Sequence, residues 1–370
     1  MSAKLYIHIG VHKTGSTMIQ SNLLRCNSLL RRENIIYLPI RGLFKPLMFI
    51  DRKDVKLIDE IKKKLRVIVS AYKKNENTKF IISTEQLSGD PGFITDSWTS
   101  GYINSRLIAE SLKEITNGFD VKIIVYLRRQ DLLVESLYTQ KIKEGGSESF
   151  NNFISNFSVK SFDWEYFLSH YSEYFNKENI FIRKYDKSYL PNKSSLIDDF
   201  SSIINSEYLI QNSESKLINK GYNRDALEIA LLLNEHLSME KRVELRALLQ
   251  DSSTRGVHDK YNFFTFTQRN EFLKKYEDSN IKVSDKYFNK PEVNLFSYPI
   301  KDHYLDQYSG LKLESVIVII FKVMMQQNNT SNTDDVKLYS KLKKYLNQSI
   351  SVLSDNQKLY LKHWYYNIRS

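Results

Sequence analysis

The chain has 370 residues, of which 41% are hydrophobic and 26% are charged, and this composition excludes a disordered protein. Its formal net charge of +11 favours an anionic partner such as a nucleotide, a nucleic acid, an acidic glycan or a membrane surface. Its single cysteine, Cys26, excludes an intramolecular disulfide and a cysteine-based zinc cluster, and it fits a reducing, cytoplasmic location.

Strand-like and helix-like segments alternate along the first half of the chain. Residues 4–10 read as a strand that ends on Gly10, without the charged and apolar regions of a signal peptide. The following segments are expected to be a helix at 16–32, a strand at 35–39, a helix at 51–72, a strand at 79–85, a helix at 103–115, a strand at 121–127 and a helix at 130–143. Because such alternation produces right-handed crossovers, the sequence predicts an α/β fold with a P-loop-type open parallel sheet flanked by helices.

The second half of the chain is predicted to add one strand at 179–185 and then mainly helices. Helical patterns cover 194–204, 225–237, 269–276 and 313–325. The apolar run at 315–325 is too short for a membrane span and is typical of a buried helix, so we expect no transmembrane segment. The polar run at 326–335 resembles a linker. We expect a main catalytic domain over residues 1–310 and a helical C-terminal extension over 311–370 that can pack on the same domain.

The segment GVHKTGST, residues 10–17, joins the first predicted strand to the first predicted helix with the glycine spacing of a phosphate-binding loop. A helix N-terminus offers unpaired N–H groups and the positive end of the helix dipole, and Ser16 and Thr17 add hydroxyl donors. The ordinary nucleotide-hydrolysing loop has its lysine directly after the second glycine, but here the lysine is Lys13, inside the loop. This position suits the leaving oxygen of a group bonded directly to a 5′-phosphate, which needs one cation and no metal.

The stretch IHIGVHKTGSTMIQ resembles the phosphosulfate-binding loop of the bacterial sulfotransferase families, which use 3′-phosphoadenosine 5′-phosphosulfate (PAPS). This resemblance, which covers roughly residues 4–296, implies that the sulfuryl donor is PAPS and that the product is 3′-phosphoadenosine 5′-phosphate. It also implies that five residues bind the 5′-phosphosulfate: Lys13, Thr14, Gly15, Ser16 and Thr17.

The same families place a second anion site, for the 3′-phosphate, at an arginine that ends a strand and a serine eight residues later. The stretch VKIIVYLRRQDLLVESLYTQ offers Arg128 and Ser136 at this separation. Arginine supplies a forked, charge-assisted contact to phosphate, and the serine hydroxyl supplies a further donor. Arg129 is the rival for the phosphate contact, and Gln130 stands where many family members have proline.

Transfer of a sulfuryl group to a hydroxyl requires a group that takes the proton of the acceptor. The strand at 79–85 delivers Glu85 to the carboxyl end of the sheet, where open α/β sheets bind ligands. The animal cytosolic branch of the superfamily has a histidine at the corresponding place. We therefore expect Glu85 to be the general base, with His12, next to Lys13, as the competing candidate.

These features together predict a PAPS-dependent sulfotransferase that acts by in-line displacement. We expect a carbohydrate acceptor, because bacterial relatives modify saccharides and aromatic residues make up 13% of the chain, but a lipid or a phenol stays open. One alternative is a P-loop kinase of a small molecule or a nucleotide. The other is a basic, non-enzymatic protein that binds nucleic acid or glycans, although no nucleic-acid-binding motif is visible.

Overall fold

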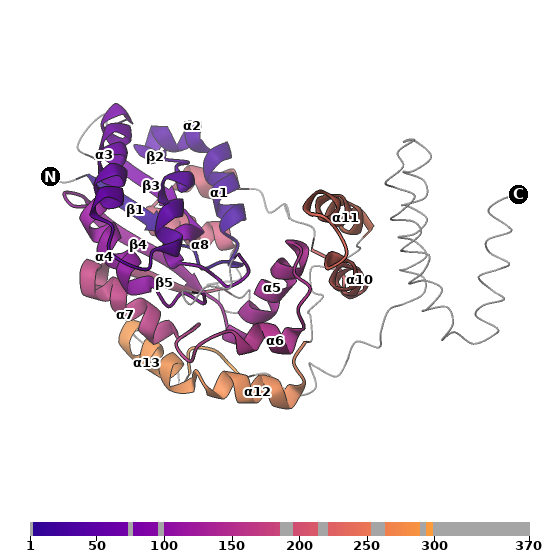
Figure 1. Ribbon diagram of the computed structural model, residues 1–370. Coiled ribbons are helices and arrows are strands. Elements are labelled where there is room, and N and C mark those ends of the chain that lie inside the picture. Colours follow the sequence, from indigo (N-terminus) through magenta and orange to yellow (C-terminus); the bar gives the residue numbers. More distant parts are fainter. Residues whose placement is uncertain are drawn as a thin grey trace, which may run out of the picture. The chain divides into compact units, whose positions relative to one another are not determined.

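The computed structural model describes residues 3–72, 77–94, 100–185, 195–213, 221–252, 263–288 and 294–298, and all structural statements below concern these residues. Five strands form one sheet in the order β2-β3-β1-β4-β5, and every neighbouring pair is parallel (Figure 1). The strands are β1 (Lys4–His8), β2 (Ile35–Tyr37), β3 (Lys79–Ser83), β4 (Asp120–Leu127) and β5 (Ile180–Lys184). The predicted α/β fold with an open, all-parallel sheet flanked by helices is therefore confirmed.

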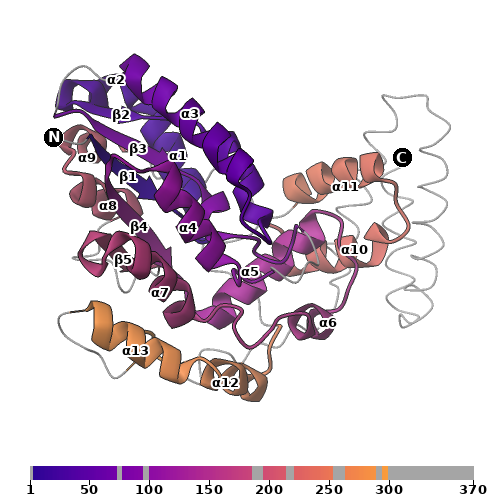
Figure 2. The same cartoon turned by 60° about the vertical axis from the view of Figure 1, so that its left-hand side comes forward.

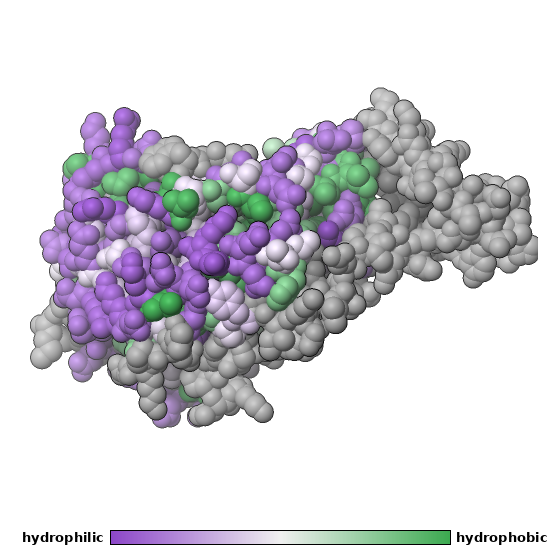
Figure 3. Space-filling view, turned by 90° about the horizontal axis from the view of Figure 1, so that it is seen from below, coloured by the Kyte–Doolittle hydropathy of each residue, from purple (hydrophilic) through white to green (hydrophobic). Residues whose placement is uncertain are grey.

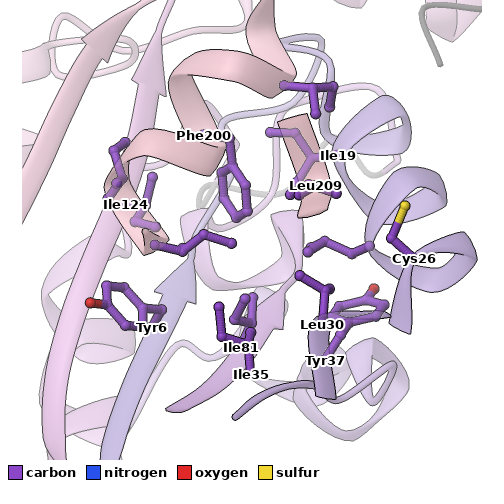
Figure 4. Packing of buried hydrophobic residues seen from close by; sticks show 14 of the residues in the cluster. Tyr6, Ile19, Cys26, Leu30, Ile35, Tyr37, Ile81, Ile124, Phe200 and Leu209 are labelled. Carbon is purple, nitrogen blue, oxygen red and sulfur yellow. The ribbon is translucent and has the colours of Figure 1, made fainter. Parts of the chain in front are cut away.

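One face of the sheet is covered by four helices from two separate parts of the sequence. They are α1 (Ser16–Arg25), α2 (Asn27–Leu30), α8 (Leu196–Ile204) and α9 (Glu207–Gln211). Side chains from the strands, such as Tyr6, Ile81 and Ile124, pack against Ile19 of α1 and Phe200 of α8 in one hydrophobic cluster (Figure 4). Because alternate residues of a strand point to opposite faces, this cluster uses every second strand residue.

The opposite face is covered by α3 (Val55–Tyr72), α4 (Ser105–Ile115) and α7 (Trp164–Phe175) (Figure 2). Leu5, Ile7 and Ile82 alternate with the residues of the first cluster and are fully buried. Short 3-10 helices connect the main elements: η1 (Arg31–Glu33), η2 (Arg41–Phe49), η3 (Glu85–Ser88) and η4 (Lys177–Asn179). Because helices cover both faces of the sheet, a ligand is expected at the carboxyl ends of the strands, where the loops leave the sheet.

A further group of helices gathers around α5 (Gln130–Lys143), which starts directly after β4. Helix α5 contacts α6 (Phe150–Ser155), α10 (Arg224–Asn234) and α12 (Phe266–Lys274). The remaining helices are α11 (Met239–Ser252), which packs on α10, and α13 (Glu277–Tyr287), which packs on α7. Apart from α6, these helices come from the second half of the chain, and α6, α10 and α12 fix the position of α5.

Buried charges join α12 to α5. The fully buried guanidinium of Arg269 donates to Asp131 at 2.5 Å and to Glu135 at 2.7 Å, and the amide of Phe263 donates to Glu135 at 2.9 Å. Burial raises the pKa of the Glu135 carboxyl, and Arg269 opposes this effect. Burial also opposes ionisation of Asp131, but hydrogen bonds from Arg129 and the charge of Arg269 hold the pKa of this carboxyl below its usual range. Removal of one member of such a group costs about 3–5 kcal/mol, so this network holds α5 firmly.

Some sequence predictions are corrected, and others fall outside the described residues. The helix predicted at 16–32 is interrupted: α1 ends at Arg25, Cys26 has a non-helical conformation (φ −88°, ψ 5°), and α2 follows. The sulfur of Cys26 contacts the Asn212 carbonyl at 3.8 Å, which places this corner against the end of α9. The predicted helix at 313–325, the linker at 326–335 and the division at residue 310 lie outside the described residues and stay predictions.

Hydrophilic residues predominate on the face of the molecule that Figure 3 shows, with hydrophobic residues scattered among them. Among the hydrophobic side chains that the structure describes, the largest exposed fractions belong to Val159, at 88%, and Met239, at 78%, which lie on different segments. Within the described part of the chain, no helix combines the length and the apolar character that crossing a membrane requires.

Candidate functional site

The loop at residues 10–17 leaves the carboxyl end of β1 and leads into α1, as the sequence predicts. Lys13 (φ 65°) and Gly15 (φ 83°) both have left-handed backbone conformations. The hydroxyl of Thr14 donates to the carbonyl of Val11, which closes the turn. Gly15 is the N-cap of α1, and no side chain caps this helix end. A left-handed conformation at a residue other than glycine is uncommon and is concentrated at functional sites, and here it directs the loop around the N-terminus of the helix.

Glycine is required at position 15 for two reasons. A side chain would be strained at its φ of 83°, and a Cβ atom would meet Cδ2 of Leu196 at 2.4 Å and Cε2 of Tyr185 at 3.2 Å. Tyr185 directly follows β5, so this ring brings a third strand end to the loop. Sequence reasoning missed Tyr185, because the pairing of β5 with β4 that places it depends on the topology of the sheet.

The hydroxyl of Ser16 has no hydrogen-bond partner among the described residues, although Ser16 is only 3% exposed. A buried hydroxyl that lacks a partner costs about 1–3 kcal/mol, so such a group in a folded protein calls for an explanation. Because Ser16 is the first residue of α1, its hydroxyl lies where a helix N-terminus receives anions. Thr17, the next residue, is exposed.

Of the two arginines after β4, Arg128 is the one that contacts the loop. Its Nη1 donates to the carbonyl of Lys13 at 2.9 Å, and its guanidinium carbon lies 5.8 Å from the centroid of the Tyr185 ring. Arg129 instead forms two hydrogen bonds with the carboxylate of Asp131, at 2.7 and 2.9 Å. The structure therefore brings Arg128 and Lys13 together and directs Arg129 to the buried network of α5.

Helix α5 also faces Lys13. The ammonium of Lys13 donates to Oε1 of Gln140 at 3.2 Å. Ser136, the serine predicted from the sequence, is partly buried and lies four residues before Gln140, on the same side of α5. Sequence reasoning missed Gln140, and the one signal for it is that Gln140 continues the face of the helix that Ser136 begins.

Glu85 lies at the carboxyl end of β3, as predicted, and is the first residue of η3. Its Oε2 accepts a hydrogen bond from Nε2 of Gln20 at 3.1 Å, and the same nitrogen donates to the carbonyl of Ser83 at 3.3 Å. Because Gln20 belongs to α1, Glu85 is held against the helix whose N-terminus forms the loop. The carboxylate is partly exposed, so one of its oxygens can meet a substrate.

His12 is surrounded by aromatic rings. Its ring centroid lies 6.0 Å from that of Tyr102, in a stacked arrangement, and 5.7 Å from that of Phe93, edge to face. Burial, assisted by the charge of Lys13, lowers the pKa of His12 to about 3. An imidazole with such an acidic conjugate acid is a weak proton acceptor, so this environment favours Glu85 over His12 as the base. Among the described residues, no group of three histidine, cysteine, aspartate or glutamate side chains is arranged to hold a metal ion.

Comparisons with known proteins add little to this picture. No protein-family model matches the chain. An uncharacterized protein of Archaeoglobus fulgidus is 30% identical over 170 residues, which are 45% of this chain and 46% of that protein, so the match spans about half the length of the relative. A crystal structure of a sulfotransferase from Alicyclobacillus acidocaldarius is similar with a TM-score of 0.36 and 12% identity, over 67% of this chain and 96% of that one. Function must therefore be inferred from the chemistry of the loop and its neighbours.

Proposed function

We propose that the protein is a sulfotransferase that moves the sulfuryl group of PAPS to a hydroxyl group of a carbohydrate. The observation that carries this proposal is the hydrogen bond from Arg128, at the end of β4, to the carbonyl of Lys13, in the loop after β1. The guanidinium of Arg128 thus contacts the backbone of the turn that carries Lys13 and leads into a helix N-terminus, so two cationic residues from separate strand ends belong to one site. PAPS carries anionic groups at both its 5′ and its 3′ position, and such a pair of cations can bind both.

The loop offers what a phosphosulfate needs. The loop presents the positive end of the α1 dipole and the hydroxyl of Ser16, which has no partner among the described residues, and it carries Lys13, whose ammonium contacts Gln140. The Lys13 ammonium donates to the neutral side-chain amide of Gln140 at 3.2 Å. These groups support binding of the 5′-phosphosulfate, and Arg128 with Ser136 supports binding of the 3′-phosphate.

In the proposed reaction, the hydroxyl oxygen of the acceptor attacks the sulfur in line with the bridging oxygen of the donor. The bond between sulfur and this bridging oxygen breaks, and the proton of the acceptor passes to Glu85. The products are a sulfate ester and 3′-phosphoadenosine 5′-phosphate. Lys13 and the loop amides stabilise the negative charge that develops on the leaving phosphate.

Support for a carbohydrate acceptor comes from the surroundings of His12. Phe93 is partly buried and packs edge to face against His12, next to the lysine of the loop. Aromatic side chains with a few placed polar groups are typical of sites for small ligands. Incubation with sulfur-labelled PAPS and separate panels of saccharides, lipids and phenols tests this choice. Label that enters lipids or phenols and not saccharides would contradict it.

Ligand-dependent thermal melting tests the donor. We expect 3′-phosphoadenosine 5′-phosphate, without added metal, to raise the melting temperature, because a ligand at a hundred times its dissociation constant stabilises the folded state by about 2.7 kcal/mol. ATP with Mg²⁺ serves as the comparison. Stabilisation by ATP and Mg²⁺ alone would indicate a kinase, and stabilisation by neither nucleotide would indicate a protein that binds nucleic acid or glycans.

The two arginines after β4 should differ in their effects on nucleotide binding. We expect Arg128→Ala to weaken binding of 3′-phosphoadenosine 5′-phosphate by about 10- to 100-fold, because a hydrogen-bonded charge contact is lost. Binding of adenosine 5′-phosphate, which lacks the 3′-phosphate, should change much less. Isothermal titration calorimetry with both nucleotides measures these changes.

Arg129→Ala is the matched control for this experiment. It removes the ion pair with Asp131 and should lower the free energy of unfolding, with a smaller effect on nucleotide affinity. If Arg129→Ala loses affinity for the bisphosphate and Arg128→Ala does not, the 3′-phosphate binds Arg129. Equal losses for both nucleotides in Arg128→Ala would mean that this arginine only supports the loop.

A further inference from the structure

His8, the last residue of β1, is a fully buried histidine with no assigned role. Its ring packs edge to face against Tyr126 and Phe200, at centroid distances of 5.8 and 5.7 Å. Its Nδ1 pairs with the hydroxyl of Ser83, the last residue of β3, at 2.8 Å. Its other nitrogen, Nε2, has no hydrogen-bond partner among the described residues. One ring nitrogen is therefore fixed, and the other is buried with its hydrogen-bonding capacity unused.

Nε2 of His8 and the hydroxyl of Ser16 both lie close to Gly10. A Cβ atom built on Gly10 would lie 3.3 Å from Nε2 of His8 and 2.7 Å from Oγ of Ser16. Both polar atoms thus lie next to the position that the absent side chain of Gly10 leaves open. Two buried polar groups that lie near one glycine and have no partner among the described residues are unusual, because such groups are normally satisfied. Their common location points to a shared role in the loop.

The tautomer of His8 decides what the Ser16 hydroxyl can do. Burial lowers the pKa of His8 to about 3, so at neutral pH the ring is uncharged and carries one N–H proton. If the proton is on Nδ1, the ring donates to Ser83, and Nε2 can only accept the proton of Ser16. The Ser16 oxygen would then turn its lone pairs to an incoming anion. If the proton is on Nε2, the ring donates to Ser16, whose own proton is left for the anion.

We propose that His8 is a positioning residue for the anion-binding loop: Ser83 donates to its Nδ1, and rotation of the Ser16 side chain lets the Ser16 oxygen, which has no hydrogen-bond partner among the described residues, accept from Nε2–H. The hydroxyl proton of Ser16 is thereby directed to the 5′-phosphosulfate. The chain of donors runs in one direction from the end of β3, through the end of β1, to the first residue of α1. Gly10 is required because a side chain would separate the two groups. The phosphosulfate in this statement depends on the proposed function, whereas the pairing of His8 with Ser16 belongs to the protein alone.

A double-mutant cycle on nucleotide affinity tests the pairing. We expect His8→Asn, which lacks a donor at the Nε2 position, to weaken binding of 3′-phosphoadenosine 5′-phosphate about tenfold. His8→Gln places an amide N–H near the Nε2 position and should retain most of the affinity. Ser16→Ala should weaken binding, and His8→Asn should add little loss when Ser16 is already alanine. Additive losses in the double variant, or equal losses in His8→Gln and His8→Asn, would overturn the proposal.

His170→Asn is the matched control. His170 is also buried, with 8% exposure, and its Nδ1 pairs with a serine hydroxyl, that of Ser105 on α4, at 2.9 Å. Its loss should lower the free energy of unfolding and leave nucleotide affinity unchanged. A loss of affinity equal to that of His8→Asn would mean that any buried histidine pair affects binding through stability, and the specific role of His8 would be wrong.

The tautomer can be measured without any nucleotide. Long-range proton–nitrogen NMR spectra of the wild-type protein show which ring nitrogen of His8 carries the proton, and we expect Nε2. A proton on Nδ1 would overturn the proposal, even if the nucleotide binds. Conversely, if the wild-type protein fails to bind 3′-phosphoadenosine 5′-phosphate, the proposed function is wrong. The pairing is then tested by this spectrum and by the same mutant cycle on the free energy of unfolding.

Discussion

Replacement of Lys13 by alanine should lower the turnover rate about 10²- to 10³-fold, with less than a tenfold change in affinity for 3′-phosphoadenosine 5′-phosphate. The reason is that the ammonium group meets charge that develops on the leaving phosphate as the bond to sulfur breaks, and this charge is greater in the transition state than in the bound donor. The left-handed backbone at Lys13 and the contact with Gln140 already hold the ammonium in place, so its removal loses a preorganised group. Steady-state kinetics and calorimetry measure the two effects.

Lys53→Ala is a suitable control for Lys13→Ala. Lys53 is also a hydrogen-bonded lysine, but it pairs with Glu110 and Glu114 of α4 at an exposed site. Its loss should leave turnover and affinity unchanged. Unchanged turnover in Lys13→Ala would show that the role given to Lys13 is wrong. A loss of affinity with an unaffected turnover rate would mean that Lys13 binds donor and transition state equally.

Glu85→Gln is expected to give a folded protein that binds the nucleotide and transfers sulfuryl groups about 10²- to 10⁴-fold more slowly. The fold should survive because a glutamine carbonyl can still accept the hydrogen bond that Gln20 donates at 3.1 Å. Nucleotide affinity should also survive, because the carboxylate is predicted to meet the acceptor rather than the donor. Transfer of label from PAPS, together with the melting temperature, checks both parts.

The corresponding change at His12 separates the two candidate bases. His12→Gln should slow transfer much less than Glu85→Gln, because the neutral ring of His12 is already a weak proton acceptor. If His12→Gln proves the more damaging change, the base is His12 and the carboxylate of Glu85 has another purpose. Normal activity in both variants would mean that neither Glu85 nor His12 is the general base.

Much of the fold follows from local patterns in the sequence. β4 could be predicted because it is a nearly unbroken apolar run, as a central strand covered on both faces requires. The order of the strands places the ends of β1, β3 and β4 next to one another, so Lys13, Glu85 and Arg128 come from neighbouring strand ends. The alternation of strands and helices was sufficient to predict this edge of the sheet as the candidate site.

Contacts between distant segments could not be predicted in the same way. The break at Cys26 has no glycine or proline to mark it, and the corner instead contacts Asn212, far along the chain. The choice between Arg128 and Arg129 depends on the carbonyl of Lys13, 115 residues earlier. One local feature of the sequence does favour Arg128 for the contact with the loop. Asp131 lies two residues after Arg129, so its carboxylate is within reach of the Arg129 guanidinium.

The buried contacts of Glu135 have a consequence for synthesis on the ribosome. Its carboxylate accepts from Arg269 and from the amide of Phe263, residues translated more than a hundred codons after α5. During elongation the nascent α5 therefore carries a carboxylate that cannot be buried at low cost until the codons for these partners have been read. Ser136, the neighbour of Glu135, lies on the same helix, so the donor side of the site should be among the last parts of the nascent domain to assemble.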